Sequence, residues 1–224
     1  MAKLNLRALI IFGFLFFSFS ANCQEFSEHY YIRKAEFEAE PDTQEEIILL
    51  GNSITEGGNW RTLFPNKNMV NRGISGDTTA GILNRLSEIT SSQPRKIFLL
   101  VGTNDLAKGK TESYVLDHVE TILRKIKNES SNTKLYLQSI LPVNPYVGNK
   151  FSKHKKNQKL IVTVNRKLKE LSAKMKVNFI DLHKKFKNHE GVLNKKYTYD
   201  GLHLNQKGYH KWKKELNPFI RKKT

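Results

Sequence analysis

Residues 46–56, with the sequence EIILLGNSITE, decide the fold that this chain is predicted to have. Residues 46–50 form a short apolar run of the kind that makes a buried strand. Gly51 then allows the backbone to turn, and Ser53 follows where a new segment starts. A serine at the end of a buried strand is well placed to act as an exposed nucleophile, although serine and asparagine are also common helix caps.

Four more strand-like runs follow, with helical patterns between them. The predicted strands are residues 46–50, 68–71, 96–101, 134–140 and 177–180. Apolar residues recur at helical spacing in the segments between them, at Val115, Val119, Ile122 and Ile126, at Leu160, Val164, Leu168, Leu171 and Met175, and in a shorter helix at Leu83, Leu86 and Ile89. This alternation predicts an α/β fold, a flavodoxin-like three-layer α/β/α sandwich with a five-stranded parallel sheet. In such sheets the ligand lies beyond the carboxyl ends of the strands.

The N-terminus has the pattern of an export signal. Two basic residues precede an apolar run over residues 8–19, which is shorter than the roughly 20 residues that a membrane span needs. We therefore expect residues 1–23 to be a signal peptide, and residues 24–224 to be a single exported domain, periplasmic or extracellular. Two alternatives stay open: the segment is retained as an anchor, or Cys23 is lipidated as in a bacterial lipoprotein. Because Cys23 is the sole cysteine, a disulfide within the domain is not expected.

Positive charge is concentrated in the last third of the chain. Residues 150–224 contain 22 Lys plus Arg and 5 Asp plus Glu, a net of +17, whereas residues 1–149 contain 16 of each. Such a field favours anionic partners, such as acidic polysaccharide or a membrane surface, although it also fits a solvated face. A nucleic-acid or nucleotide role is not expected, because the lysines lack interleaved aromatic residues and the glycines lack the dinucleotide and P-loop spacings.

Four polar segments carry candidate chemistry, and each has an ordinary structural alternative. They are LGNSITE at 50–56, NRGISGDT at 71–78, VGTND at 101–105 and DGLHL at 200–204. The glycines of the second segment can leave backbone N–H groups free for an anion, and Asn104 can aim its amide at the same place. Asp200, three residues before His203, can orient an imidazole that takes a proton from a serine. Asp181 and His183 form a second acid–histidine pair that competes for this role.

Taken together, the four segments resemble the SGNH hydrolases, also called GDSL esterases and lipases. The sequences GNSIT, GISGDT, GTND and DGLH come in that family's order, and the resemblance covers roughly residues 45–214. It implies an ester hydrolase that needs no metal or cofactor. The site residues that it implies are the nucleophile Ser53, the triad partners Asp200 and His203, and the oxyanion donors Ser53, Gly76 and Asn104. The chain departs from the family at Asn52, where an aspartate is usual, and we expect this amide to bond across the neighbouring loops.

The substrate is predicted only as a class. Possible substrate contacts are Asn52, Trp60 and Tyr146, and Trp60 has the alternative of packing in the core. A long apolar lid is not apparent, so a short acyl group is expected. Together with export and a basic flank, this favours removal of an acetyl group from a carbohydrate, as in the acetylhydrolase branch that the chain resembles. The alternatives are a lysophospholipase or thioesterase of the same family, or a non-catalytic module that binds glycan or phosphate.

Overall fold

The computed structural model describes residues 26–221. The predicted signal peptide, its cleavage site and Cys23 lie outside these residues. No helix within residues 26–221 combines the length and the apolar content that a membrane-spanning segment requires.

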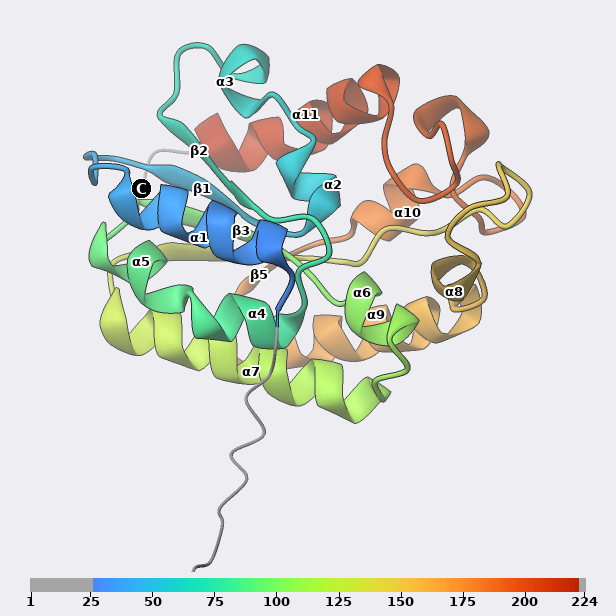
Figure 1. The fold of residues 1–224 in the computed structure, drawn as a ribbon, viewed down its shortest axis with the longest axis horizontal. Coiled ribbons are helices and arrows are strands. Elements are labelled where there is room, and N and C mark those ends of the chain that lie inside the picture. Colours follow the sequence, from blue (N-terminus) through green and yellow to red (C-terminus); the bar gives the residue numbers. More distant parts are fainter. Residues whose placement is uncertain (1–25, 222–224) are drawn as a thin grey trace, which may run out of the picture.

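Five parallel strands form one sheet through the middle of the described chain (Figure 1). In chain order they are β1 Ile47–Gly51, β2 Met69–Gly73, β3 Lys96–Leu100, β4 Lys134–Gln138 and β5 Asn178–Ile180. Their order across the sheet is β2-β1-β3-β4-β5, so the chain reverses its direction of winding between β1 and β3. This switch point is where open sheets of this type bind ligands. The predicted α/β class and five-stranded parallel sheet are confirmed.

Helices cover both faces of the sheet. They are α1 Glu28–Ala39, α2 Ser53–Glu56, α3 Trp60–Leu63, α4 Thr79–Asn84, α5 Leu86–Ser91, α6 Thr103–Ala107, α7 Glu112–Glu129, α8 Ser152–Lys155, α9 Gln158–Lys174, α10 Leu182–Phe186 and α11 Gln206–Arg221, with a 3₁₀ turn at Lys195–Tyr197. Helices α7 and α9 run along one face and α11 along the other (Figure 1). Their buried residues recur every three or four positions, as an amphipathic helix requires.

Two long helices were not predicted from the sequence. Helix α11 buries Trp212, Leu216 and Ile220 at spacings of four, a pattern that the many lysines around it obscure. Helix α1 buries only Tyr30 and Phe37 along its length, so its apolar face is too narrow to give a clear periodic signal.

Trp60 belongs to the core, and the expectation that it contacts substrate is wrong. Its side chain is 1% exposed, and its ring meets the Trp212 ring edge to face with centroids 4.8 Å apart. The indole Nε1–H donates a hydrogen bond to the Thr55 carbonyl oxygen at 2.9 Å. A large aromatic ring whose polar group is satisfied internally packs α3 onto α11 and is not available to a ligand.

Candidate active site

The loops after β1, β2 and β3 start at the same level of the sheet. Gly51 is in register with Gly73 of β2 on one side and with Leu100 of β3 on the other. A side chain at Gly51 is excluded, because a Cβ there would lie 2.4 Å from the Leu100 carbonyl oxygen. The three polar segments predicted from the sequence therefore leave the sheet next to one another, at its carboxyl edge.

Ser53 is the first residue of α2, directly after β1. Asn52 caps this helix, since its Oδ1 accepts a hydrogen bond from the Ile54 N–H at 3.1 Å. Asn52 is fully buried, so its predicted contact with substrate is wrong. The expectation that its amide bonds across the loops is also wrong, because Asn52 Nδ2 has no hydrogen-bond partner among the described residues. The cap leaves the Ser53 hydroxyl free to engage another segment.

That segment is the loop that carries His203. Ser53 Oγ lies 3.0 Å from His203 Nε2, and His203 Nδ1 lies 2.7 Å from Asp200 Oδ2. An ionised carboxylate can only accept hydrogen bonds, so the imidazole proton sits on Nδ1 and the Nε2 lone pair faces the serine. Ser53, 150 residues before His203 in the sequence, thus joins His203 and Asp200 in one hydrogen-bonded chain. The imidazole is in the tautomer that can take a proton from a hydroxyl.

Asp200 is held in its ionised form. Burial by itself would raise the pKa of this carboxyl group. The His203 side chain and the backbone N–H groups of Leu202 and His203 all donate to it, and together they bring its pKa below the usual value. The same bonds fix the carboxylate in position, because Oδ1 holds the turn while Oδ2 is left to the imidazole.

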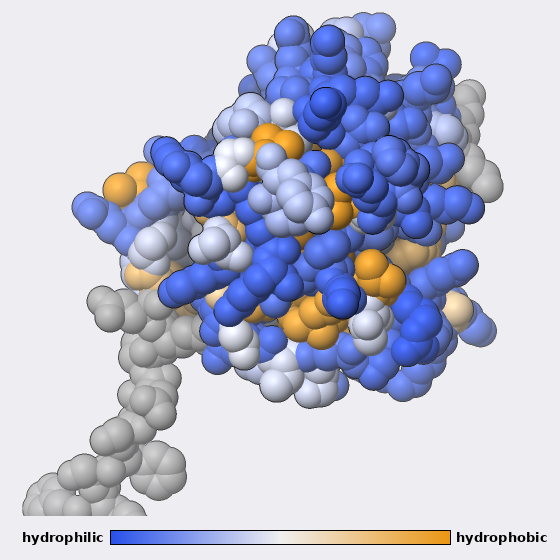
Figure 2. Space-filling model, turned by 90° about the vertical axis from the view of Figure 1, so that its right-hand side faces the viewer, coloured by the Kyte–Doolittle hydropathy of each residue, from blue (hydrophilic) through white to orange (hydrophobic). Residues whose placement is uncertain are grey.

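Two aromatic residues that the sequence reasoning missed flank His203. The Phe151 ring meets the imidazole edge to face at 4.9 Å, and the Tyr199 ring lies nearly parallel to it at 6.1 Å. Tyr199 is 66% exposed, so it borders the entrance to the site. Figure 2 shows this face of the molecule, where small apolar areas lie among mostly hydrophilic side chains. Tyr146, predicted as a substrate contact, lies in the loop after β4 and is 80% exposed.

Gly76 and Asn104 come from the two neighbouring loops. Gly76 has a φ of +80°, a left-handed conformation that favours glycine. Asn104 lies in α6, and its Nδ2 donates to the Asp77 carbonyl oxygen at 2.8 Å. Because Asp77 directly follows Gly76, this bond ties the amide to the glycine turn. The second Nδ2 hydrogen has no protein acceptor among residues 26–221.

A buried ion pair between Arg85 and Asp77 stabilises the turn at Gly76. Arg85 and Asp77 are both fully buried, and Arg85 Nη2 lies 2.9 Å from Asp77 Oδ2. Arg85 Nη2 also donates to the carbonyl oxygens of Arg72, next to last in β2, and Gly51, the last residue of β1. Burial raises the pKa of Asp77 to about 6, against the opposing effect of Arg85. A single guanidinium thus links two strand ends to the loop that carries Gly76.

The competing pair, Asp181 and His183, has a different role. Asp181 Oδ1 caps α10 by accepting from the Lys184 N–H. His183 Nε2 lies 3.4 Å from the Gln158 side-chain nitrogen. The imidazole that contacts Ser53 is that of His203.

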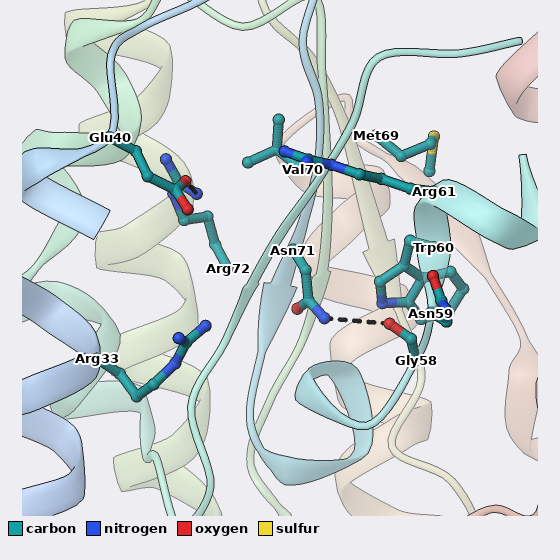
Figure 3. Close-up of a pocket in the computed structure, with 10 residues that line it drawn as sticks. All are labelled: Arg33, Glu40, Gly58, Asn59, Trp60, Arg61, Met69, Val70, Asn71 and Arg72. Atoms are coloured by element: carbon teal, nitrogen blue, oxygen red, sulfur yellow. Dashed lines mark hydrogen bonds and ion pairs between the residues drawn. The ribbon is translucent and has the colours of Figure 1, made fainter. Parts of the chain in front are cut away.

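A hollow beside the edge strand β2 is separate from this chain of contacts. Figure 3 shows a cavity of about 330 Å³ between α1 and α3, which Arg33, Arg61 and Arg72 help to line. Its lining residues include neither Ser53 nor His203, and Arg72 is engaged by Glu40 and Glu88. Within residues 26–221 no group of three or more His, Cys, Asp or Glu side chains is placed to hold a metal ion.

Comparison with known proteins agrees with this geometry. The rat platelet-activating factor acetylhydrolase IB subunit alpha2 is 30% identical over 190 residues, which cover 80% of this chain and 77% of that protein. A solved Streptococcus pneumoniae protein, provisionally described as a platelet activating factor, is 29% identical with a TM-score of 0.79, over 86% of this chain and 92% of its own. An acetyl xylan esterase shares the fold at 20% identity and a TM-score of 0.63, over 78% of this chain and 99% of its own. The model of the GDSL-like lipase/acylhydrolase family matches residues 49–211, more than half of the sequence, and the chain belongs to that family.

Proposed function

We propose that the protein is a serine esterase in which Ser53 is the nucleophile. The observation that carries this proposal is the chain of hydrogen bonds from Ser53 Oγ through the His203 imidazole to Asp200. His203 Nε2 takes the hydroxyl proton as Ser53 Oγ attacks the ester carbonyl carbon. The C–O bond of the ester then breaks, and the same proton passes from Nε2 to the departing alcohol oxygen. Asp200 stabilises the imidazolium that exists between these two transfers.

The negative charge that develops on the carbonyl oxygen is stabilised by three donors in this proposal. They are the backbone N–H groups of Ser53 and Gly76 and the Nδ2–H of Asn104. Removal of one such donor typically lowers turnover by about 10²–10³. Water hydrolyses the resulting acyl-serine in the second half of the reaction. His203 takes a proton from that water, and returns it to Ser53 Oγ as the carboxylic acid leaves.

We propose an acetyl group as the acyl group and a carbohydrate as the alcohol. The names of two similar proteins, an acetylhydrolase and an acetyl xylan esterase, support a short acyl group. Tyr199 and Tyr146 are exposed rings on segments that border the site, and such rings can stack on the face of a sugar. Proteins that act on long acyl chains need a deep apolar pocket, whereas the face in Figure 2 has only small apolar areas.

Anionic substrates fit the same proposal. Five exposed lysines lie on the two segments that carry Phe151 and Tyr199, namely Lys150, Lys153, Lys156, Lys195 and Lys196. A positive rim raises the local concentration of a negatively charged ester. We therefore propose that the basic last third faces an acidic polysaccharide or an anionic surface, and that export through residues 1–23 brings the enzyme to it. Hydrolysis of an anionic acetyl ester should slow with added salt, while a neutral ester should not respond.

The test of this function is a parallel rate comparison on acetylated sugars, acetylated polysaccharide, lysophospholipid and aryl esters from acetyl to octanoyl, with Ser53→Ala as the blank. We expect the acetyl esters to be hydrolysed fastest and the Ser53→Ala protein to be inactive but folded. A maximum at octanoyl or on lysophospholipid would instead indicate the lysophospholipase or thioesterase alternative. Undiminished activity in Ser53→Ala would refute the mechanism, and inactivity of the unmodified protein on every ester would favour a binding module.

A further inference from the structure

His154 contacts the side-chain amide of Asn104, which is one of the three oxyanion donors in the proposed mechanism. Its Nε2 lies 2.9 Å from Asn104 Oδ1. The other end of the same amide, Nδ2, donates to the Asp77 carbonyl oxygen at 2.8 Å. Asn104 is therefore held at both ends, and its orientation depends on two partners from different segments.

The two contacts fix the amide orientation and the histidine tautomer together. A carbonyl oxygen such as that of Asp77 can only accept, so the atom of Asn104 that faces it must be the nitrogen. The atom that faces His154 is then the oxygen, and His154 Nε2 must carry the hydrogen. His154 Nδ1 is consequently a bare nitrogen, and it is buried without a partner among residues 26–221. Burial lowers the pKa of His154, as does the nearby His203, while Asp200 acts in the opposite direction.

The turn that carries His154 is itself tightly constrained. Phe151 has φ and ψ of 62° and 32°, a left-handed conformation that is rare for a bulky side chain. The His154 N–H donates to the Phe151 carbonyl oxygen at 2.9 Å, which closes the turn. The Phe151 ring packs at 4.9 Å from the His203 ring and at 5.8 Å from the His154 ring. One short segment therefore contacts both the proposed base and the partner of the oxyanion amide.

We propose that His154 is a positioning residue for catalysis, which orients the Asn104 amide so that its second Nδ2–H points at the oxyanion. The inference rests on the proposed esterase function, and it adds a residue outside the four segments that indicated that function. His154 touches no reacting atom in this account. It acts through Asn104, because without the donor at Oδ1 the amide can rotate away from the geometry that the transition state needs.

Two substitutions of nearly equal length separate the hydrogen bond from packing. His154→Gln retains an N–H donor that can reach Asn104 Oδ1, whereas His154→Met fills similar space without one. We expect His154→Met to lower kcat on an aryl acetate by about 10- to 100-fold with KM unchanged, which is less than complete removal of a donor. His154→Gln should recover most of that loss. His183→Met is the matched control, because His183 is another buried histidine and its imidazole lies against Gln158, whereas the imidazole that contacts Ser53 is that of His203.

The decisive comparison repeats the substitution in an Asn104→Ala background. If His154 acts only through this amide, His154→Met should have no further effect on kcat there. An equal fall in kcat in both backgrounds would overturn the inference, and so would wild-type kcat in the single variant. These results are distinct from failure of the esterase proposal itself, which would appear as undiminished activity in Ser53→Ala.

The tautomer can be read on the unmodified protein, so the inference does not depend on the variants folding. Nitrogen-15 NMR near pH 8 should show His154 as a neutral ring protonated at Nε2. A ring protonated at Nδ1 would mean that Asn104 Oδ1 has no donor, and the inference would be wrong.

Discussion

Replacement of Asp200 by asparagine is expected to disable the protein almost completely while leaving it folded. Asp200 Oδ1 accepts from the N–H groups of Leu202 and His203 at 2.9 and 2.8 Å. An asparagine oxygen can accept the same two bonds, so the turn that carries His203 should keep its shape. Only the contact of Oδ2 with His203 Nδ1 changes, because an amide nitrogen donates where the carboxylate accepted.

The substitution also changes the protonation of His203 Nε2, the ring nitrogen that faces Ser53. With a donor at Nδ1, the ring takes its other tautomer and carries its proton on Nε2, which lies 3.0 Å from Ser53 Oγ. Two donors then face each other, and the serine has no base. In a serine protease the corresponding change lowers kcat by about 10⁴, or roughly 5 kcal/mol of transition-state stabilisation. We expect a loss of that order here, with the melting temperature close to that of the unmodified protein.

The assay is steady-state hydrolysis of an aryl acetate, with thermal unfolding measured on the same samples. Asp181→Asn is the matched control, because Asp181 also precedes a histidine and caps a turn but has no contact with Ser53. It should retain full kcat. If Asp200→Asn keeps more than about a tenth of kcat while it remains folded, the assignment of Asp200 as the orienting acid is wrong.

Three further predictions concern stability. Arg85→Leu should lower the free energy of unfolding in urea by about 3–5 kcal/mol, since it leaves the buried Asp77 carboxyl group without its partner, and Asp77→Asn in the same protein should restore part of the loss. Trp60→Ala should lower it by about 3–5 kcal/mol and leave KM unchanged, because the ring packs in the core; a raised KM at full stability would contradict this. Burial lowers the pKa of His154 and of His183, so the unfolded chain binds protons first as the pH falls below about 6.5. Stability should therefore decline below that pH, and less steeply when both histidines are glutamine; equal slopes would rule out this contribution.

Much of the fold was accessible from the sequence because local patterns coincide with the final packing. The run at 46–50 is apolar from Ile47 onward, as suits a central parallel strand, and the structure displaces the strand by a single residue to Ile47–Gly51. The strand predicted at 134–140 ends earlier, at Gln138, because the Ile140 N–H and carbonyl bond to the Asn165 side chain instead of to a neighbouring strand. These two hydrogen bonds depend on Asn165 in α9, which lies 25 residues away in the sequence, so the pattern around Ile140 could not predict them.

The candidate site likewise contains residues that the sequence could predict and residues that it could not. Ser53, His203 and Asp200 lie in short motifs, so their residue types and order were sufficient to select them. Phe151 and His154 lie in a lysine-rich stretch with no motif, and only the tertiary structure brings them to the site. Their one feature visible in the sequence is an aromatic residue three positions before a histidine, which is too common to be informative. Residues that support a site through contacts are defined by packing, and packing is what a single sequence leaves unspecified.

The central claim is that Ser53 is a nucleophile activated by His203, and covalent labelling tests it most directly. A fluorophosphonate probe followed by peptide mass spectrometry should find the adduct on Ser53 in the unmodified protein. The label should be absent from Ser53→Ala and strongly reduced in His203→Ala, while His183→Ala should label normally. An adduct on another serine, or undiminished labelling of the His203→Ala protein, would contradict the account.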